Sequence, residues 1–303
     1  MKRSILAILG VICLVLPTVA SAEESSAGLA FLKLGVGARA IGLGDAYTAV
    51  DGDASSVYWN PAGILNVENI DVTLTHSEWF QDIRYEYIGG VQSYGDYAIG
   101  AGIVGLYMDD LERRDGPSAE PIGHFGVFDF AFTGTYARRL SDHLDVGGSL
   151  KYMHEKIDDQ TAKGVAVDLG GRYRVPGFDG LTAAVAVLNL GPQMKFIEES
   201  FDLPVMYKLG MAIDVPAESL NGNILIATDA VLPADGSTKL HFGIEYEFAN
   251  MLALRFGYRT GWDNHNVSAG LGVKVRNFRL DYAVVPFYSE LGDTHRISLG
   301  VML

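Results

Sequence analysis

Three patterns in this 303-residue chain contain residue types that could do chemistry, and none completes a site. Gly35-Val-Gly37-Ala-Arg-Ala40 has the spacing of a dinucleotide-binding turn, but no strand precedes it and no strand–helix–strand unit follows. Asp51-Gly-Asp53 begins like a calcium loop and lacks the required glycine and terminal glutamate. The seven histidines show no metal-ligand spacing, and no G-x-S-x-G occurs. We therefore expect that the protein binds no cofactor and no metal and is not an enzyme. The alternative is a hydrolase whose Ser, His and Asp come from different strands.

The N-terminus has the three parts of a secretory signal. Two basic residues precede an apolar run from Ile5 to Leu16, and Ala20-Ser21-Ala22 is a cleavage site. Residues 1–22 are therefore an expected signal peptide, and its removal takes away the only cysteine, Cys13. The remaining 281 residues carry a net charge of −16, which argues against nucleic acid as a partner.

From about residue 71 onward, apolar residues occupy every second position. In Lys239 to Phe248 the even positions are apolar and the odd positions are polar or small. The runs are about ten residues long, which fits a tilted membrane strand of ~9–11 residues better than an ordinary strand of ~5–6. The expected strands are 71–80, 84–94, 97–108, 124–137, 143–154, 163–174, 181–190, 203–214, 222–231, 238–248, 251–260, 266–276, 277–285 and 295–303.

The even strand count predicts an all-β fold, a 14-stranded antiparallel transmembrane β-barrel over residues 69–303. Short turns alternate with the longer expected loops 109–123, 155–162, 191–202, 261–265 and 286–294. This is the outer-membrane pattern of a Gram-negative-type bacterium, and it puts both termini on the periplasmic side. Tyrosines on the apolar face near strand ends support two aromatic girdles, which a soluble periplasmic β-protein would not need: Tyr107, Tyr152, Tyr207, Tyr258, Tyr136, Tyr173 and Tyr246.

The opposite face of the strands predicts the lumen of the barrel. Its charged residues are Arg172, Arg174, Asp168, Lys208, Asp214, Asp229, Glu245, Arg255, Arg259, Lys274, Arg279 and Asp281. If Phe248 pairs with Leu252, Glu245 lies opposite Arg255 as a cross-strand ion pair. The main candidates are Glu245, Arg255, Arg259 and Arg172, either as a mutually paired lining or as a ligand-specific charge ring.

Residues 23–68 do not alternate and are dominated by Gly, Ala and Ser, with an Asn-Pro turn. A barrel of this width has a lumen that wall side chains cannot fill, so we expect this segment to be an N-terminal hatch or plug in the lumen. The candidate hatch and ligand-gating residues, as anchors rather than catalysts, are Arg39, Gly44, Asp45, Asn60, Pro61 and Gly63.

The same segment resembles the start of the FadL superfamily of outer-membrane transporters for long-chain fatty acids and other hydrophobic compounds, most closely the PorV/PorQ-like (UPF0164) group. The residues that carry the resemblance are Gly37-Ala-Arg39-Ala, Gly42-x-Gly44-Asp-Ala-Tyr-Thr-Ala, Asp53-Ala-Ser-Ser-Val-Tyr-Trp-Asn60-Pro61-Ala62-Gly63 and His295-Arg-Ile-Ser-Leu-Gly. The resemblance implies a fourteen-stranded barrel with an N-terminal hatch. The chain departs from the usual pattern by ending in Leu303 instead of phenylalanine.

Two functions follow as hypotheses, and a merely structural barrel is a third possibility. The first is transport of hydrophobic or amphipathic small molecules across the outer membrane, with the hatch shifting to let them pass. The second is a PorV-like component of a type IX-like secretion system that binds secreted cargo or translocon partners through its loops. Other expected partners are outer-membrane lipid and the barrel-assembly machinery. The glycines Gly100, Gly102 and Gly105 mark either a kink in the wall or a surface opposite the hatch.

Overall fold

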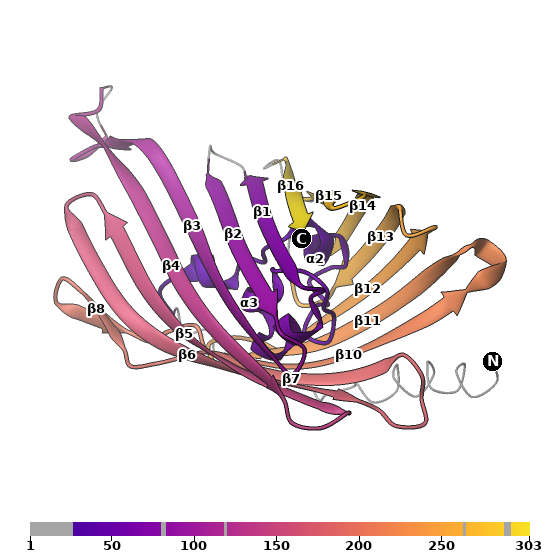
Figure 1. The fold of residues 1–303 in the computed structure, drawn as a ribbon. Helices are drawn as coiled ribbons and strands as arrows, with labels where there is room; N and C mark the ends of the chain where they lie inside the picture. The colour runs from indigo at the N-terminus through magenta and orange to yellow at the C-terminus, as the bar shows by residue number, and fades with distance from the viewer. Residues whose placement is uncertain (1–26, 80–82, 118–119, 263–264, 288–291) are drawn as a thin grey trace.

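The computed structural model describes residues 27–79, 83–117, 120–262, 265–287 and 292–303. The expected signal peptide, 1–22, lies outside these residues. Fourteen strands form one closed antiparallel barrel in the order β1-β16-β15-β14-β13-β12-β11-β10-β7-β6-β5-β4-β3-β2, and β2 pairs with β1 to close it (Figure 1). The prediction of a fourteen-stranded barrel is therefore confirmed. No described helix is both long enough and apolar enough to cross a membrane.

The strand bounds agree with the expected ranges to within a few residues at most strand ends. The barrel strands are β1 (Ile70–Glu78), β2 (Arg84–Ser93), β3 (Tyr97–Arg113), β4 (Gly123–Arg139), β5 (Leu144–Ile157), β6 (Gln160–Arg174), β7 (Leu181–Leu190), β10 (Met206–Ala217), β11 (Gly222–Pro233), β12 (Lys239–Phe248), β13 (Leu252–Arg259), β14 (Val267–Val275), β15 (Phe278–Pro286) and β16 (Asp293–Met302). A separate hairpin consists of β8 (Met194–Phe196) and β9 (Glu199–Phe201).

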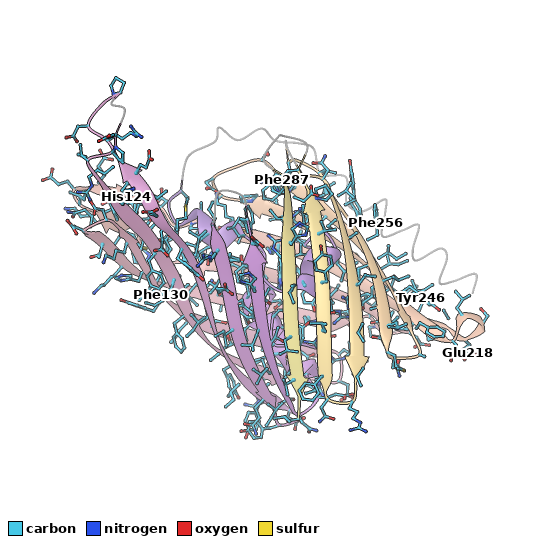
Figure 2. The ribbon with its side chains drawn as sticks, turned by 90° about the horizontal axis from the view of Figure 1, so that it is seen from above. His124, Phe130, Glu218, Tyr246, Phe256 and Phe287 are labelled. Atoms are coloured by element: carbon cyan, nitrogen blue, oxygen red, sulfur yellow. The ribbon has the colours of Figure 1, made fainter. Side chains whose placement is uncertain are left out.

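Alternation sorts the side chains between the outside of the barrel and its lumen. On β12, Ile244 is 44% exposed, whereas its neighbour Glu245 is 4% exposed. Phe248 pairs with Leu252 and Glu245 with Arg255, so the expected cross-strand pairing is confirmed. Figure 2 labels Phe256 and Tyr246 among the side chains of the outer wall. Of the expected girdle tyrosines, those exposed on the outer face are Tyr136, Tyr152, Tyr173, Tyr207 and Tyr258.

The two ends of the barrel differ in their connections. We call the end with the β6–β7 and β10–β11 connections the turn side, and the end with the β3–β4 hairpin the loop side. On the loop side, β3 and β4 are 17 residues long, and their hairpin extends beyond β1, β2 and β16 (Figure 1). The expected loop 109–123 was therefore too long, because Arg113 pairs with Gly123. The expected loop 155–162 was also wrong, since Ile157 pairs with Gln160 across a tight turn. The expected loop 191–202 contains the β8–β9 hairpin.

Residues 27–69, which we call the luminal segment, lie inside the barrel (Figure 1). The segment contains η1 (Ala30–Lys33), α2 (Ala38–Gly42), α3 (Ser56–Trp59) and η2 (Pro61–Asn66). Helix α2 contacts β13 to β16, and η2 contacts β2 to β6, so the segment touches opposite parts of the wall. Most of its side chains are buried. Small residues permit this because they allow close backbone approach at little steric cost.

Candidate functional site

The candidate site is the contact between the luminal segment and the wall. The Arg39 guanidinium donates to both carboxylate oxygens of Glu245, with Nη2 2.7 Å from Oε1 and Nε 3.0 Å from Oε2. Arg255 on β13 also donates to Glu245, and its Nη1 lies 2.6 Å from Oδ1 of Asp281. The carboxylate of Glu245 is therefore shared between one arginine of the luminal segment and one arginine of the wall. Bidentate guanidinium–carboxylate pairs of this kind are strong and directional.

Two further ion pairs tie the luminal segment to the wall. Asp45, whose φ is +64°, accepts from Nη1 of Arg259 at 2.6 Å. On the other side of the barrel, Arg172 lies 2.5 Å from Asp51 and donates to the carbonyl oxygen of Ala49 at 2.9 Å. Burial raises the pKa of Asp45, but Arg259, with His241 and Arg296, outweighs burial and holds that pKa below its ordinary value.

The ion pairs continue around the lumen through Asp53. Its carboxylate accepts from the Tyr47 hydroxyl at 2.7 Å and from the Ser55 amide at 2.9 Å, and Arg279 lies 3.8 Å away. Burial raises the pKa of Asp53, yet Arg279 and Arg39 together bring it below the ordinary value. Every principal charge candidate of the wall thus pairs with a carboxylate or a guanidinium, which favours the mutually paired lining over a free charge ring.

The glycine and Asn-Pro candidates are packing contacts. A Cβ added at Gly257 of β13 would lie 2.1 Å from the Gly44 nitrogen, so two backbones touch there. A Cβ at Gly170 of β6 would lie 2.0 Å from Oδ1 of Asn60, and one at Gly147 would lie 2.5 Å from the carbonyl carbon of Pro61. We call these wall glycines sockets, because the luminal segment occupies the space that a side chain at each of them would need.

Other candidate glycines serve the same packing. Within the luminal segment, Gly63 packs against Ser56, since an added Cβ would lie 3.1 Å from the serine Cβ. On β3, Gly100 and Gly102 face Val57 of the luminal segment. The only register shift in β3 lies instead between Met108 and Leu111, so these two glycines mark the surface opposite the luminal segment and not a kink.

Some anchoring contacts could not be inferred from the sequence. Asp229 was expected in the lumen, and its carboxylate accepts from the amides of Tyr47 and Thr48 at 3.0 and 2.9 Å and from the Thr48 hydroxyl at 2.7 Å. The hydroxyl of Tyr85 donates to the carbonyl oxygen of Leu34 at 2.7 Å. Tyr85 stands on the lumen side of β2, opposite the lipid-facing tyrosines. The only sign of this anchoring contact in the sequence was the position of Tyr85 in the alternation of β2, which places its side chain on the lumen face.

On the loop side of the luminal segment, the lumen is filled by apolar side chains, which we call the loop-side apolar core. Its wall members include Val104, Leu106, Met153, Ala162 and Ala166. The β8–β9 hairpin folds over it, with Met194 and Leu203 buried and Phe196 and Phe201 packed against the core. An apolar core thus lies in the loop-side half of the lumen, whereas ion pairs mark the contact between the luminal segment and the wall.

A polar pocket of about 380 Å³ lies on the turn side. It is lined by Arg39, Asp51, Arg172, Arg174 and the β6–β7 turn, among other residues. Three members of the ion pairs that anchor the luminal segment, Arg39, Asp51 and Arg172, therefore line a space at the turn-side mouth.

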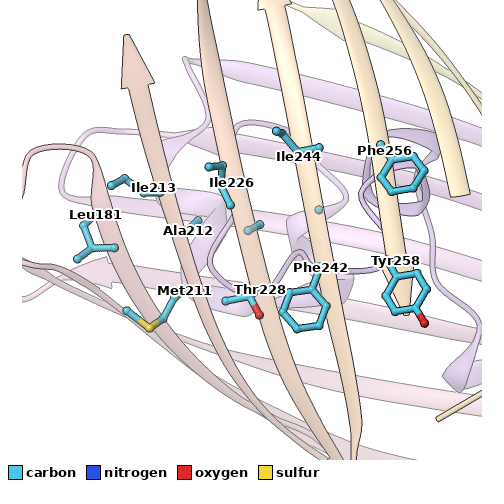
Figure 3. Close-up of a pocket in the computed structure, with 12 residues that line it drawn as sticks. Leu181, Met211, Ala212, Ile213, Ile226, Thr228, Phe242, Ile244, Phe256 and Tyr258 are labelled. Carbon is cyan, nitrogen blue, oxygen red and sulfur yellow. The ribbon is translucent and has the colours of Figure 1, made fainter. Parts of the chain in front are cut away.

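A second pocket, of about 240 Å³, lies on the outer wall over β7 and β10 to β13 (Figure 3). Figure 3 shows Ile244, Phe256 and Tyr258 along it, and all three are exposed on the outer face. Because this groove faces away from the luminal segment, it is a feature of the lipid-facing surface and lies outside the candidate site.

Among the described residues, no group of three or more His, Cys, Asp or Glu side chains could hold a metal ion. Residues 20–230 match the family described as "Type IX secretion system protein PorV". No curated protein matches the sequence.

Several solved structures share the fold. The "CymD monoaromatic hydrocarbon channel" has a TM-score of 0.61 at 12% identity, covering 91% of this chain and 97% of that one. The toluene transporter TodX of Pseudomonas putida has a TM-score of 0.59 at 12% identity, covering 89% and 99%. A FadL homologue of Pseudomonas aeruginosa has a TM-score of 0.54 at 10% identity, covering 84% and 95%. The matched proteins are channels and a secretion-system protein, not enzymes.

Proposed function

The chain belongs to the PorV family of type IX secretion system proteins, and within that frame we propose that this outer-membrane barrel passes hydrophobic or amphipathic small molecules, with the luminal segment as its hatch. The observation that carries the proposal is the division of the lumen. The loop-side apolar core would give an apolar molecule apolar contacts once its side chains move apart, and the luminal segment beneath it is held by a small number of ion pairs that can exchange partners. The fold shared with a monoaromatic hydrocarbon channel and a toluene transporter supports the same class of cargo.

The proposed route begins on the loop side, which we assign to the cell exterior, with both termini periplasmic. A molecule enters where the β8–β9 hairpin covers the apolar core. It then passes the luminal segment when residues Gly44 to Gly63 shift from their glycine sockets, and it leaves through the polar turn-side pocket. Arg39, Asp45, Asn60 and Pro61 act as anchors of the closed state. Assembly by the barrel-assembly machinery and contact of the apolar outer wall with lipid belong to this proposal.

A reversible disulfide across the hairpin tests the transport proposal. A Cβ at Gly164 would lie 2.5 Å from Cγ of Met194, so the double variant Gly164→Cys/Met194→Cys brings two thiols together in a mature chain that we expect to have no other cysteine. Cells carrying the variant should take up radiolabelled toluene and oleate when reduced and should lose most of this uptake when oxidised. Uptake by the wild-type chain no faster than by cells without it would contradict the proposal.

A second candidate function is docking of a secreted protein or a translocon partner, and the β3–β4 hairpin favours it. These strands continue past their neighbours on the loop side, with the exposed charges Glu112 and Arg114 near the tip. Removing residues 110–124 would shorten the hairpin without entering the lumen. If the secretion function holds, pull-downs from outer membranes should recover secretion proteins in stoichiometric amounts with the full chain and lose them with the shortened hairpin.

A further inference from the structure

Three polar side chains meet on the lumen side of the wall, where β5, β6 and β7 lie side by side (Figure 1). They are Lys151 on β5, Asp168 on β6 and Asn189 on β7, and they are 5%, 0% and 1% exposed. The side-chain nitrogen of Lys151 lies 2.5 Å from Oδ1 of Asn189 and 3.0 Å from Oδ2 of Asp168. The ion pair of Lys151 with Asp168 would balance the buried charge by itself, so the amide beside it needs a separate explanation.

A bulge in β7 brings Asn189 to this position. Two residues of β7, Leu188 and Asn189, lie opposite the single residue Asp168 of β6. Asn189 has a left-handed backbone, with φ at +63°. In a regular strand its side chain would point outward like that of Val185, which is exposed, whereas here both Leu188 and Asn189 are buried. Bulges redirect side chains in this way and are frequent next to functional sites.

Hydrogen bonds hold the three groups in one orientation. Nδ2 of Asn189 donates to the carbonyl oxygen of Pro204 at 3.0 Å, which turns Oδ1 towards Lys151. The backbone amide of Asn189 donates to Oδ1 of Asp168 at 2.7 Å. Oδ2 of Asp168, beside the lysine nitrogen, has no hydrogen-bond partner of its own in the described chain. A nucleophilic nitrogen, an amide carbonyl that accepts a hydrogen bond from it and a carboxylate with a free oxygen are therefore in contact.

We propose that Lys151 and Asn189 form an intramolecular isopeptide bond. Asp168 takes a proton from the Lys151 ammonium, and the lone pair that this frees on Nζ attacks Cγ of Asn189. Asp168 then gives its proton to Nδ2 and takes a second proton from Nζ, while the bond from Cγ to Nδ2 breaks and ammonia leaves. The products are a secondary amide and a neutral carboxyl group at Asp168, so no charge is left unpaired in the wall. The reaction needs no oxidant, reductant or cofactor.

The bond links the wall at the place where strand pairing stops. β7 ends at Leu190, the residue after Asn189, and the chain continues from there to the β8–β9 hairpin. In the described chain, residues 160–166 of β6 pair with β5 alone. A covalent link from β5 to Asn189 therefore fixes the base of the hairpin to a strand that is paired along its length.

Mass spectrometry of the wild-type chain, purified from outer membranes, tests the bond directly. The intact chain should weigh less than its sequence, counted from the N-terminus found by peptide mapping, by the mass of one ammonia. Trypsin should fail to cleave after Lys151 and should release a branched peptide that joins residues 140–156 to residues 175–195. A chain of full sequence mass that yields the free peptide 140–151 would overturn the inference. Loss of water instead of ammonia would place the link on Asp168 and would also overturn it.

Variants then assign the roles of the three residues. Lys151→Arg removes the nucleophile and Asp168→Asn removes the proton acceptor, so folded, heat-modifiable barrels of both variants should have the full sequence mass. Lys163→Arg, at an exposed position of β6, is the matched control and should keep the ammonia loss. Ammonia loss that persists in Lys151→Arg would come from cyclisation of Asn189 onto its own backbone and would overturn the inference.

Discussion

At the scale of single residues, the ion pairs around Glu245 hold the luminal segment in place. One carboxylate serves Arg39 of the segment and Arg255 of the wall, and Arg255 continues to Asp281. A buried network of this kind adds little net stability over apolar packing, but removing one member leaves the others charged and unpaired. It is therefore well suited to a contact that must be specific when closed and must be able to open.

Glu245→Gln tests this contact. The variant leaves Arg39 and Arg255 without their shared counter-charge, and breaking such a buried pair costs about 3–5 kcal/mol. We expect the luminal segment to become sensitive to trypsin, which cleaves after arginine, at enzyme concentrations that leave the wild-type chain intact. Glu218→Gln, at an exposed turn-side position, is the matched control. Equal trypsin resistance of the two variants would show that the Glu245 contact does not hold the segment.

The pH dependence of the closed state follows from Asp45 and Asp53, whose pKa values both lie below the ordinary carboxyl value. A depressed pKa contributes stability that is fully present above the unfolded value of about 4 and is lost as pH falls through the folded value. Protection of the luminal segment against amide hydrogen exchange, measured in detergent and expressed relative to the intrinsic exchange rate at each pH, should therefore decline only at pH below about 4. In the Asp45→Asn variant, which has no carboxyl group to protonate at this position, the decline below pH 4 should be smaller than in the wild-type chain. A decline that begins near pH 6 would point to histidine instead.

At the scale of elements, the fit between η2 and the β5–β6 wall depends on glycine. Gly147 and Gly170 are sockets for Pro61 and Asn60, and any side chain there would collide with the luminal segment. Asn60 in turn donates to the carbonyl oxygen of Thr48 at 2.8 Å and accepts from the Ala62 amide at 3.0 Å, so it links two turns of the segment. A side chain at position 170 that displaces Asn60 should therefore also weaken its hydrogen bonds to Thr48 and Ala62 and loosen the luminal segment away from Gly170.

Gly170→Val is the corresponding test at this scale. Overpacking costs about 1–3 kcal/mol, and here it falls on the contact between segment and wall rather than on the strand pairing. We expect a barrel that still runs as a folded, heat-modifiable band and admits a hydrophobic dye faster than wild type. Gly134→Val is the control, because a Cβ at Gly134 meets nothing within 4 Å. Equal dye entry in the two variants would contradict the socket role of Gly170.

The barrel could be predicted from the sequence because each strand carries its own period-two pattern. The predicted loops were wrong where this pattern gives no signal. The tip of the β3–β4 hairpin is polar on both faces, so its strands were predicted too short. The strands β8 and β9 have three residues each, which is too short for a period of two to be recognised. The residues of the candidate site could also be named in advance. The pair of Glu245 with Arg255 was predicted because a short turn joins its strands, but the pairs between the luminal segment and the wall could not be predicted, because pairs such as Arg39 with Glu245 join positions 206 residues apart.

At the scale of the whole molecule, three parts have distinct physical character. The outer wall is apolar, the contact between wall and luminal segment contains ion pairs and is rich in glycine, and an apolar core covered by a hairpin lies in the loop-side lumen. A barrel with a merely structural role would show no conductance that depends on the position of the luminal segment. The account therefore depends on whether movement of the luminal segment opens the barrel.

The most direct measurement is conductance of the full chain with the luminal segment reversibly stapled to the wall. A Cβ at Gly100 would lie 3.0 Å from a Val57 methyl group, so Val57→Cys/Gly100→Cys places one thiol on α3 and one on β3. In planar bilayers, the oxidised protein should stay closed when oleate is added, and the same molecules should show ligand-dependent openings after reduction. Identical conductance before and after reduction would contradict the hatch.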